Sequence, residues 1–211
     1  MESKIRIIKQ WLGTGSINIF GIQFSGKDTL GVKLAELLDA NFLSSGDLVR
    51  AAAKKNSSAE IQQAAIDSEQ GILTPTEQFR ELIVPHLKDE CLMGKPLVLS
   101  SVGRWYGEEE VVMQALRESQ HDLKAVIVME ISLDEVWRRW ELSKDEPRNG
   151  GRVDDLDKDK VNKRLTEFRE KTIPVIEKYD QLGLSYHVNS EQSREDTLTE
   201  VVDHLYQLAK N

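Results

Sequence analysis

The amino-acid sequence predicts an α/β fold in which a parallel β-sheet is covered by helices on both faces. Three observations predict it. Short apolar runs alternate with segments of helical spacing, a glycine-rich turn joins the first run to the first long helix, and a length of 211 residues suits one domain. In such folds ligands bind beyond the carboxyl ends of the strands, so functional residues are expected directly after them.

Four apolar runs are expected to form strands of this sheet. They are residues 17–20, 96–100, 124–131 and 184–188. The third run, KAVIVMEI, is the longest and is rich in β-branched side chains. We therefore expect it to be a central strand of the sheet, with a neighbour on each side.

Segments with apolar residues at helical spacing lie around these runs. Residues 1–15 are an extension, expected to form a short amphipathic helix in which Ile5, Ile8 and Trp11–Leu12 pack inward. Pro85 is expected to kink or reset the helix that contains it. Helices are predicted at 27–38, 46–55, 59–69, 76–92, 108–118, 134–142, 157–179 and 197–208, with a charged loop at 143–157.

The composition excludes several classes of protein. The chain has 28 basic and 36 acidic residues and a formal net charge of −8, which argues against nucleic acid or an anionic membrane as partner. No apolar stretch approaches the roughly 18 residues that span a bilayer, and the charged first residues lack the apolar run of a secretory signal. The single cysteine, Cys91, fits a reducing compartment. We expect a cytoplasmic monomer.

Residues 21–29 (GIQFSGKDT) form a glycine-rich loop between the first predicted strand and the helix that follows. Glycines let backbone N–H groups turn inward around phosphate oxygens, and the amino terminus of a helix adds partial positive charge. Lys27 is expected to reach the terminal phosphates of a nucleotide, and the Thr29 hydroxyl to approach Mg²⁺. The alternative is a plain strand–helix turn with a solvated lysine.

This loop resembles that of the adenylate kinases and related nucleoside monophosphate kinases, which usually reads GxPGSGKGT. Gln23, Phe24 and Asp28 depart from that pattern. The resemblance implies a P-loop NTPase-type sheet of five parallel strands, in one kinase domain over residues 16–211. Small insertions are implied for the acceptor (about 45–75) and for a short lid (about 143–157). The implied nucleotide-binding residues of the loop are Gly21, Ser25, Gly26, Lys27, Asp28 and Thr29.

Residues 42–50 (FLSSGDLVR) and 71–75 (GILTP) resemble the acceptor segments of that family. By this resemblance Ser45 hydrogen-bonds the acceptor nucleotide and Arg50 holds its phosphate. Taken alone, Ser45 could instead cap the following helix, and Arg50 could be an ordinary surface residue.

The strongest resemblance lies at 151–155 (GRVDD), 163–165 (KRL) and 172–176 (TIPVI), and it is to the short-lid members. It implies that Arg152 and Arg164 contact the transferring phosphoryl group and that Arg139 stacks on the adenine of ATP. Arginine suits the first task because phosphoryl transfer depends mainly on positioning and neutralised charge. One cysteine excludes the four-cysteine zinc site of long-lid relatives, so no zinc is expected.

Residues 100–104 (SSVGR) correspond to a family segment that reads DGFPR. Arg104 is kept and is implied to bind the acceptor phosphate. Ser100 replaces the aspartate that helps to hold hydrated Mg²⁺. Since one carboxylate is lost and one is gained near the same strand ends, we hypothesise that Asp28 supplies the missing group.

Glu108 replaces a glutamine that reads the acceptor adenine in the family. An ionised carboxylate accepts hydrogen bonds but donates none, so it matches adenine only in part and would suit guanine better. The alternative is that Glu108 merely begins a helix, where acidic residues are favoured.

The resemblance as a whole implies transfer of the γ-phosphoryl group of ATP–Mg²⁺ to a nucleoside monophosphate, with ATP and AMP giving two ADP as the leading reaction. Lys27, Arg104, Arg152 and Arg164 would neutralise charge during direct in-line transfer. Two alternatives stay open. One is a related kinase with another base or a small-molecule acceptor, and the other is a nucleotide-binding protein without catalysis.

Overall fold

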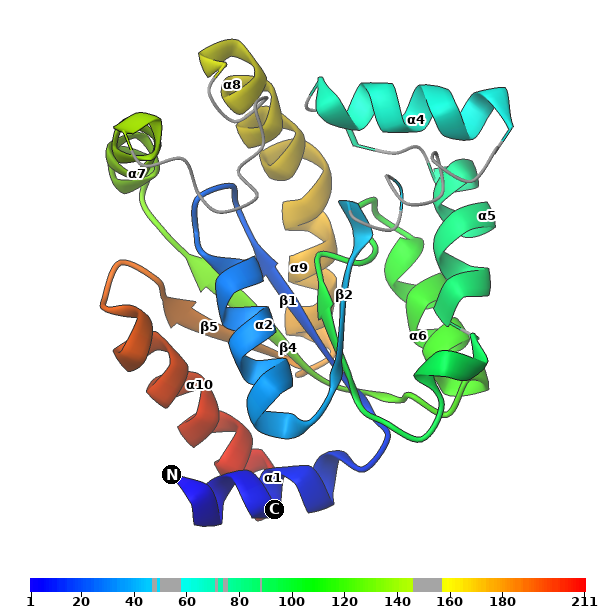
Figure 1. Cartoon of the computed structure of the whole chain (residues 1–211), viewed down its shortest axis with the longest axis vertical. Helices are drawn as coiled ribbons and strands as arrows, with labels where there is room; N and C mark the ends of the chain where they lie inside the picture. Colours follow the sequence, from blue (N-terminus) through cyan, green and yellow to red (C-terminus); the bar gives the residue numbers. More distant parts are fainter. Residues whose placement is uncertain (47–48, 50–57, 71, 74–75, 88, 146–156) are drawn as a thin grey trace.

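The centre of the molecule is one sheet of five parallel strands, as the sequence predicts (Figure 1). The computed structural model describes residues 1–46, 49, 58–70, 72–73, 76–87, 89–145 and 157–211. The strands lie in the order β2-β3-β1-β4-β5. Their bounds are β1 Ser16–Gly21, β2 Asn41–Ser44, β3 Leu97–Ser100, β4 Leu123–Glu130 and β5 Ser185–Asn189.

Helices alternate with these strands along the chain. Their bounds are α1 Glu2–Leu12, α2 Lys27–Leu38, α4 Ala59–Glu69, α5 Thr76–Leu87, α6 Glu108–Glu118, α7 Leu133–Asp145, α8 Lys158–Glu167, α9 Ile173–Gln181 and α10 Arg194–Leu208. The described residues also include a 3₁₀ turn at Glu90–Leu92 and a π turn at Phe168–Thr172.

Both faces of the sheet are covered by helices (Figure 1). α1, α2 and α10 pack on the face that carries Ile17 and Ile19. α5 and α6 pack over Leu99, and α9 packs over Phe20, on the opposite face. Every residue of β1 is therefore buried, as expected for a central parallel strand.

The amino-terminal extension is part of this core. α1 buries Ile5, Ile8 and Leu12 in the same cluster as β1, which confirms the predicted amphipathic helix. The Nζ of Lys4 lies 2.5 Å from the Asp203 carboxylate of α10 and joins the two ends of the chain at the surface.

The apolar pattern does not predict β2. Its sequence is NFLS, and three of its four residues are half-buried because the strand lies at the edge of the sheet. An edge strand needs no continuous apolar run, so its signal in the sequence is weak.

Several helix boundaries correct the predictions. The helix predicted at 76–92 ends at Leu87, and Pro85 lies inside it without ending it. α7 continues to Asp145, so the predicted loop at 143–157 begins later than expected. The segment predicted as one helix at 157–179 is interrupted by the π turn. The rest of that loop, 146–156, and most of the helix predicted at 46–55 lie outside the described residues.

The register of the sheet brings several strand ends to one edge. Ser100 at the end of β3 pairs with Ile19 of β1 and with Ser44 at the end of β2. The segments that follow β1, β2 and β3 therefore start side by side. These segments contain most of the residues that the sequence singles out.

Two histidines near β5 have opposite electrostatic surroundings. His187 lies between Glu130 (Nδ1 to Oε1, 2.7 Å) and Asp180 (Nε2 to Oδ1, 2.9 Å). Burial lowers the pKa of His187, but hydrogen bonds and charges of these carboxylates outweigh it and raise the pKa above its ordinary value. His204 stacks on Tyr186, and burial lowers its pKa.

We expect these histidines to give opposite pH dependence of stability. His187 stabilises the fold in its protonated form, so its contribution is full below about pH 6.5 and is lost as the pH rises through its raised pKa. His204 contributes above about pH 6.5, and its contribution is lost as the pH falls through its lowered pKa. Urea unfolding of His187→Asn and His204→Asn at about pH 5.5 and about pH 8 measures both contributions. Equal pH profiles for the two variants would contradict the assignment.

Candidate functional site

A tight turn joins β1 to the amino terminus of α2. Phe24 and Gly26 have φ angles of 66° and 88°, in the left-handed region. A Cβ added to Gly21 would lie 2.5 Å from the Ser25 Oγ, so a larger residue there would displace the Ser25 side chain. The chain therefore curls closely around the first turn of α2, whose N–H groups lack partners within the helix and favour an anion.

Phe24 takes a backbone conformation that is unfavourable for a bulky side chain, at a cost of about 1–3 kcal/mol. Its ring is buried among Val136, Trp140 and Val161. Burial of such a side chain contributes about 1.5–3 kcal/mol, which offsets the strain. Phe24 thus ties the loop to α7 and α8, at a position where the resembled pattern has glycine.

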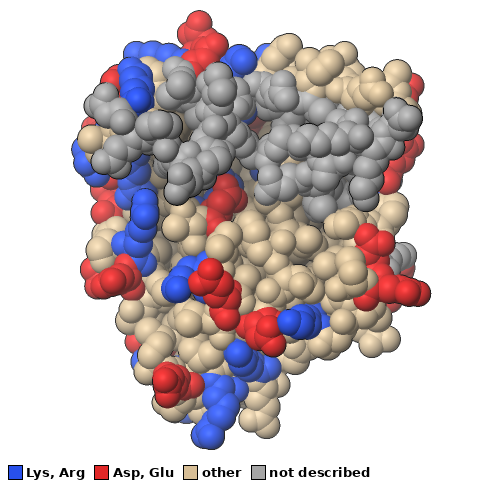
Figure 2. All heavy atoms as spheres, in the orientation of Figure 1, with Lys and Arg blue, Asp and Glu red and all other residues tan. Residues whose placement is uncertain are grey.

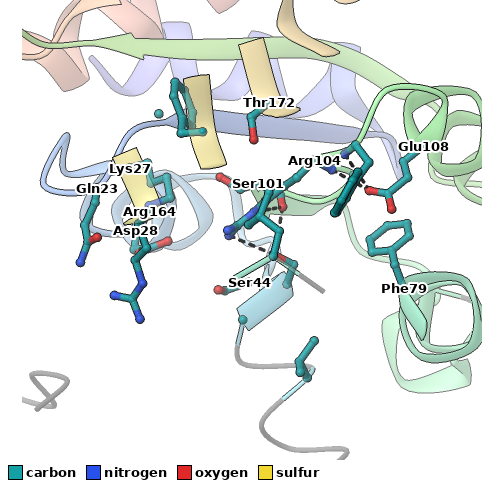
Figure 3. Close-up of a pocket in the computed structure, with 18 of the residues that line it drawn as sticks. Gln23, Lys27, Asp28, Ser44, Phe79, Ser101, Arg104, Glu108, Arg164 and Thr172 are labelled. Atoms are coloured by element: carbon teal, nitrogen blue, oxygen red, sulfur yellow. Dashed lines mark hydrogen bonds and ion pairs between the residues drawn. The ribbon is translucent and has the colours of Figure 1, made fainter. Parts of the chain in front are cut away.

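A pocket opens where β1, β2 and β3 end (Figure 3). Ser25 is buried within the loop, and its hydroxyl has no hydrogen-bond partner among the described residues. Arg139 is not part of the described lining, and Arg50 and Arg152 lie outside the described residues. The pocket brings together the predicted residues Gly21, Gly26, Lys27, Asp28, Thr29, Ser45, Arg104, Glu108 and Arg164.

The turn after β3 is held in place by a buried amide. The Asn18 side chain, in the middle of β1, donates to the Val102 carbonyl (2.8 Å) and accepts from the Val102 N–H (3.3 Å). The Ser101 N–H donates to the Ile19 carbonyl at 2.9 Å. Ser101 and Gly103 have positive φ angles of 51° and 78°, so the chain bends sharply here.

Arg104 is directed by this turn toward the end of β2. Its Nε donates to the Ser101 carbonyl (3.1 Å), and its Nη2 donates to the Ser45 Oγ (3.3 Å). The Ser45 hydroxyl in turn donates to the Ser101 carbonyl at 2.9 Å. Ser45 and Arg104, predicted from separate motifs to bind one acceptor, therefore form one hydrogen-bonded unit.

Asp28 and Ser100 meet at the same edge. The Ser100 hydroxyl donates to Asp28 Oδ1 at 2.5 Å, and the other carboxylate oxygen lies 3.8 Å from the Lys27 Nζ. About half of the Asp28 side chain, 54%, is exposed. The carboxylate gained in the loop thus lies against the serine that replaces the family aspartate.

Arg139 braces the loop. Its Nη1 donates to the Phe24 carbonyl at 3.1 Å and its Nη2 to the Ser190 carbonyl at 2.5 Å. Its Nε donates to Glu135 at 2.8 Å. Hydrogen bonds from Arg138 and Arg139 lower the pKa of Glu135 to about 2, against a small opposing effect of burial. These bonds support the loop backbone, and the predicted stacking on adenine stays a prediction.

The π turn aligns three residues toward the pocket. Arg164, Phe168 and Thr172 all line it, at spacings of four residues. In a regular α-helix such spacings drift by about 40° each around the axis. The wider π turn over Phe168–Thr172 reduces this drift. The pocket role of Phe168 and Thr172 was not predicted, because residues 157–179 were expected to form one regular helix.

The Thr172 hydroxyl is buried and has no hydrogen-bond partner among the described residues. Figure 3 shows its side chain pointing into the pocket, between the loop and Arg104. Buried hydroxyls are usually hydrogen-bonded, so this group is available to a ligand. The TIPVI motif, which includes Thr172, is the signal in the sequence from which this position could have been found.

A polar contact joins the acceptor side of the pocket to the same helix. Glu167 accepts from the Leu73 N–H (3.2 Å) and from Lys171 (2.5 Å). The Lys171 ammonium lies 4.0 Å from the centre of the Trp105 ring, a cation–π contact. Leu73 and Trp105 both line the pocket, together with Phe79. Leu73 belongs to the GILTP segment that resembles an acceptor segment, whereas Trp105 and Phe79 were not predicted to line the site.

Charge is mixed over the rest of the described surface. Figure 2 shows acidic and basic side chains interspersed on the face viewed, in contrast to the one-sign patch that nucleic acid requires. Among the helices of the described part of the chain, none combines the length and hydropathy of a bilayer span.

The fold and the loop define a P-loop phosphate-binding protein, and comparison with known proteins identifies its family. The family model for adenylate kinase matches residues 19–184. The adenylate kinase of Bartonella bacilliformis is 30% identical over 171 residues, which cover 80% of this chain and 88% of that protein. That of a Synechococcus species is 29% identical over 184 residues (87% and 90%), and that of Phocaeicola vulgatus 27% over 175 residues (82% and 89%). The chain belongs to the adenylate kinase family and is thus a nucleoside monophosphate kinase.

The Asn18 amide gives a testable prediction about how the site is held. Asn18→Ala leaves the buried Val102 N–H and carbonyl without partners, at an expected cost of about 2–4 kcal/mol in the free energy of unfolding. Asn189→Ala, at an exposed position of β5, is the control and is expected to change stability by less than about 1 kcal/mol. Urea unfolding followed by circular dichroism measures both. Similar midpoints for the two variants would show that the amide does not hold the turn.

Proposed function

We propose that this protein transfers the γ-phosphoryl group of ATP–Mg²⁺ to AMP, which yields two ADP. The observation that carries the proposal is one pocket lined by Lys27 of the phosphate loop and by the hydrogen-bonded pair Ser45 and Arg104. Two phosphate-binding groups that face one pocket suit transfer between two bound nucleotides. The names of the relatives support AMP as the acceptor.

The donor phosphates are proposed to lie in the loop between Gly21 and Thr29. Backbone N–H groups of the turn and the amino terminus of α2 favour their negative charge. Lys27 is the first residue of α2 and lines the pocket. Its ammonium group is proposed to contact the terminal phosphates of ATP. Phe24 and Arg139 hold the loop from behind and keep its N–H groups in position before the nucleotide binds.

The arginines are proposed to neutralise the transferring group. Arg104 enters from the acceptor side and Arg164 from α8, and both line the pocket. Guanidinium groups match the equatorial oxygens of a phosphoryl group in geometry and charge. By their motifs, Arg50 and Arg152 add to this set. Transfer then needs no covalent intermediate, because positioned donors stabilise the charge that develops.

Asp28 and Thr29 fit a magnesium ion that is bound with ATP. Both present oxygen donors in the pocket, the ligand type that Mg²⁺ prefers, and phosphates and water supply the remaining ligands. A magnesium ion held there would supply positive charge that offsets the negative charge of the phosphates. The Ser100 hydroxyl holds one Asp28 oxygen in place, and the other oxygen lies 3.8 Å from the Lys27 Nζ.

The test of the proposed reaction is turnover of ATP–Mg²⁺ with AMP, GMP, CMP, UMP and dTMP in turn. We expect ADP formation with AMP and a fall of about 100-fold or more in kcat/KM for Lys27→Ala. Lys33→Ala is the matched control, since Lys33 lies on the same helix, is exposed and contacts Glu36. Intact ATP binding without turnover of any monophosphate would refute the proposal.

The proposed role of the Asp28 carboxylate in binding Mg²⁺ can be tested by removing it and by placing a carboxylate at residue 100 instead. Asp28→Gly is expected to raise the Mg²⁺ concentration needed for half-maximal activity by about tenfold, because one metal-facing oxygen group is removed. The double variant Asp28→Gly, Ser100→Asp returns a carboxylate to the end of β3 and is expected to recover most of the loss. Calorimetric titration of ATP with and without Mg²⁺ gives the same comparison without catalysis. An unchanged Mg²⁺ titration in Asp28→Gly would exclude the role.

A further inference from the structure

The pocket contains a buried carboxylate oxygen that no described residue satisfies. Glu108 is only 1% exposed. Its Oε2 accepts from the backbone N–H groups of Arg104 (2.8 Å) and Trp105 (3.0 Å). Its Oε1 has no hydrogen-bond partner within the described residues. Buried polar atoms are usually paired in native proteins, so this atom calls for a partner that binds in the pocket.

The surroundings of Oε1 suit a flat heterocycle. Figure 3 shows the Phe79 ring close to Glu108, on the side of the pocket away from Lys27 and Asp28. Leu73 and Trp105 are further apolar members of the lining. Phosphate-binding groups thus lie at one end and apolar groups with a single carboxylate at the other. A nucleoside monophosphate has the same polarity, with its phosphate toward Arg104 and its base toward Glu108.

The backbone determines which kind of hydrogen bond this position can make. Both N–H groups on Oε2 are donors, so the atom there must be an acceptor. In the native carboxylate, Oε1 is then a second acceptor and seeks an N–H. In a glutamine at 108, the amide oxygen must occupy the Oε2 position, and its NH₂ would face the pocket as a donor. The single change Glu108→Gln therefore reverses the hydrogen-bonding character of this site.

We propose that Glu108 selects a 6-oxopurine monophosphate, GMP or IMP, as an acceptor in addition to AMP. Guanine and hypoxanthine carry a hydrogen on ring nitrogen N1, which donates to an acceptor oxygen, whereas N1 of adenine is itself an acceptor. The inference rests on the proposed phosphoryl transfer and names the acceptor class of the same pocket. AMP then binds best when Glu108 carries a proton that N1 can accept.

The surroundings of Glu108 favour its protonated form more than water does. Burial raises the pKa of Glu108 above its ordinary value, while the Trp105 N–H, the nearby Thr76 hydroxyl, the Arg104 N–H and the charge of Arg104 act against it. Tyr179 on α9 is a further titratable group within electrostatic reach, and its pKa is raised by burial first and then by the charges of Glu109 and Glu108. The preference for GMP over AMP is therefore expected to increase with pH.

The experiment compares AMP, GMP and IMP with the wild type, Glu108→Gln and Glu109→Gln. Glu109 is a matched control because it is equally buried on the same helix, yet it accepts from the Gly107 N–H and is not part of the described pocket lining. Dissociation constants from calorimetry and kcat/KM values are both measured. We expect Glu108→Gln to shift the GMP-to-AMP ratio by about tenfold or more toward AMP and to abolish its pH dependence. Glu109→Gln is expected to leave the ratio unchanged.

The outcomes separate this inference from the proposed function. A ratio that Glu108→Gln does not move overturns the inference, even if turnover with AMP is normal. A ratio that moves in the binding measurement without turnover supports the inference and refutes the proposed reaction. If Glu108→Gln fails to fold, the wild type is titrated with purine riboside 5′-monophosphate, which lacks the N1 hydrogen of IMP and has no amino group. We expect it to bind about tenfold more weakly than IMP, and equal affinity overturns the inference.

Discussion

The hydrogen bonds between Asn18 and Val102 are the interaction on which the site depends. Asn18 lies buried in β1, the strand that leads into the phosphate loop, and Val102 lies in the turn that carries Arg104. The two bonds fix the donor side of the pocket relative to the acceptor side. Breaking either bond leaves a buried polar group without a partner, which costs free energy. β1 and the turn after β3 therefore stay fixed relative to each other. Ser45 and Arg164 line the same pocket, next to the segments that these bonds hold together.

The departures from the family pattern are accompanied by local compensation. Phe24 takes a strained backbone conformation, and its ring is buried against α7 and α8. Asp28 brings negative charge beside the phosphate loop, and Ser100 and Lys27 lie around it. Glu108 places a carboxylate where the base is expected, and backbone N–H groups hold one of its oxygens. Each substitution is therefore understood through its neighbours and not through its position in a motif.

Much of this arrangement could be predicted from the sequence. The loop at 21–29 stood out because glycine, lysine and threonine follow a buried strand at fixed spacing, and the structure places them in one pocket. Other features escaped prediction because they depend on partners far away in the chain. β2 is recognisable only through its pairing with β3. The π turn that directs Thr172 into the pocket has no local signature of the kind that glycine or proline provides.

By itself, the sequence determined the fold class, the phosphate loop and the family, because periodicity and short motifs are local properties of the chain. Only the tertiary structure decided what those residues face. It joined Asp28 to Ser100 and Ser45 to Arg104, and it left one oxygen of Glu108 without a described partner in an apolar part of the pocket. Such pairings depend on the register of β1, β2 and β3, which no single segment contains. The physical reason is that hydrogen bonding and burial at a site are set by distances between segments, and these distances exist only once the sheet has formed.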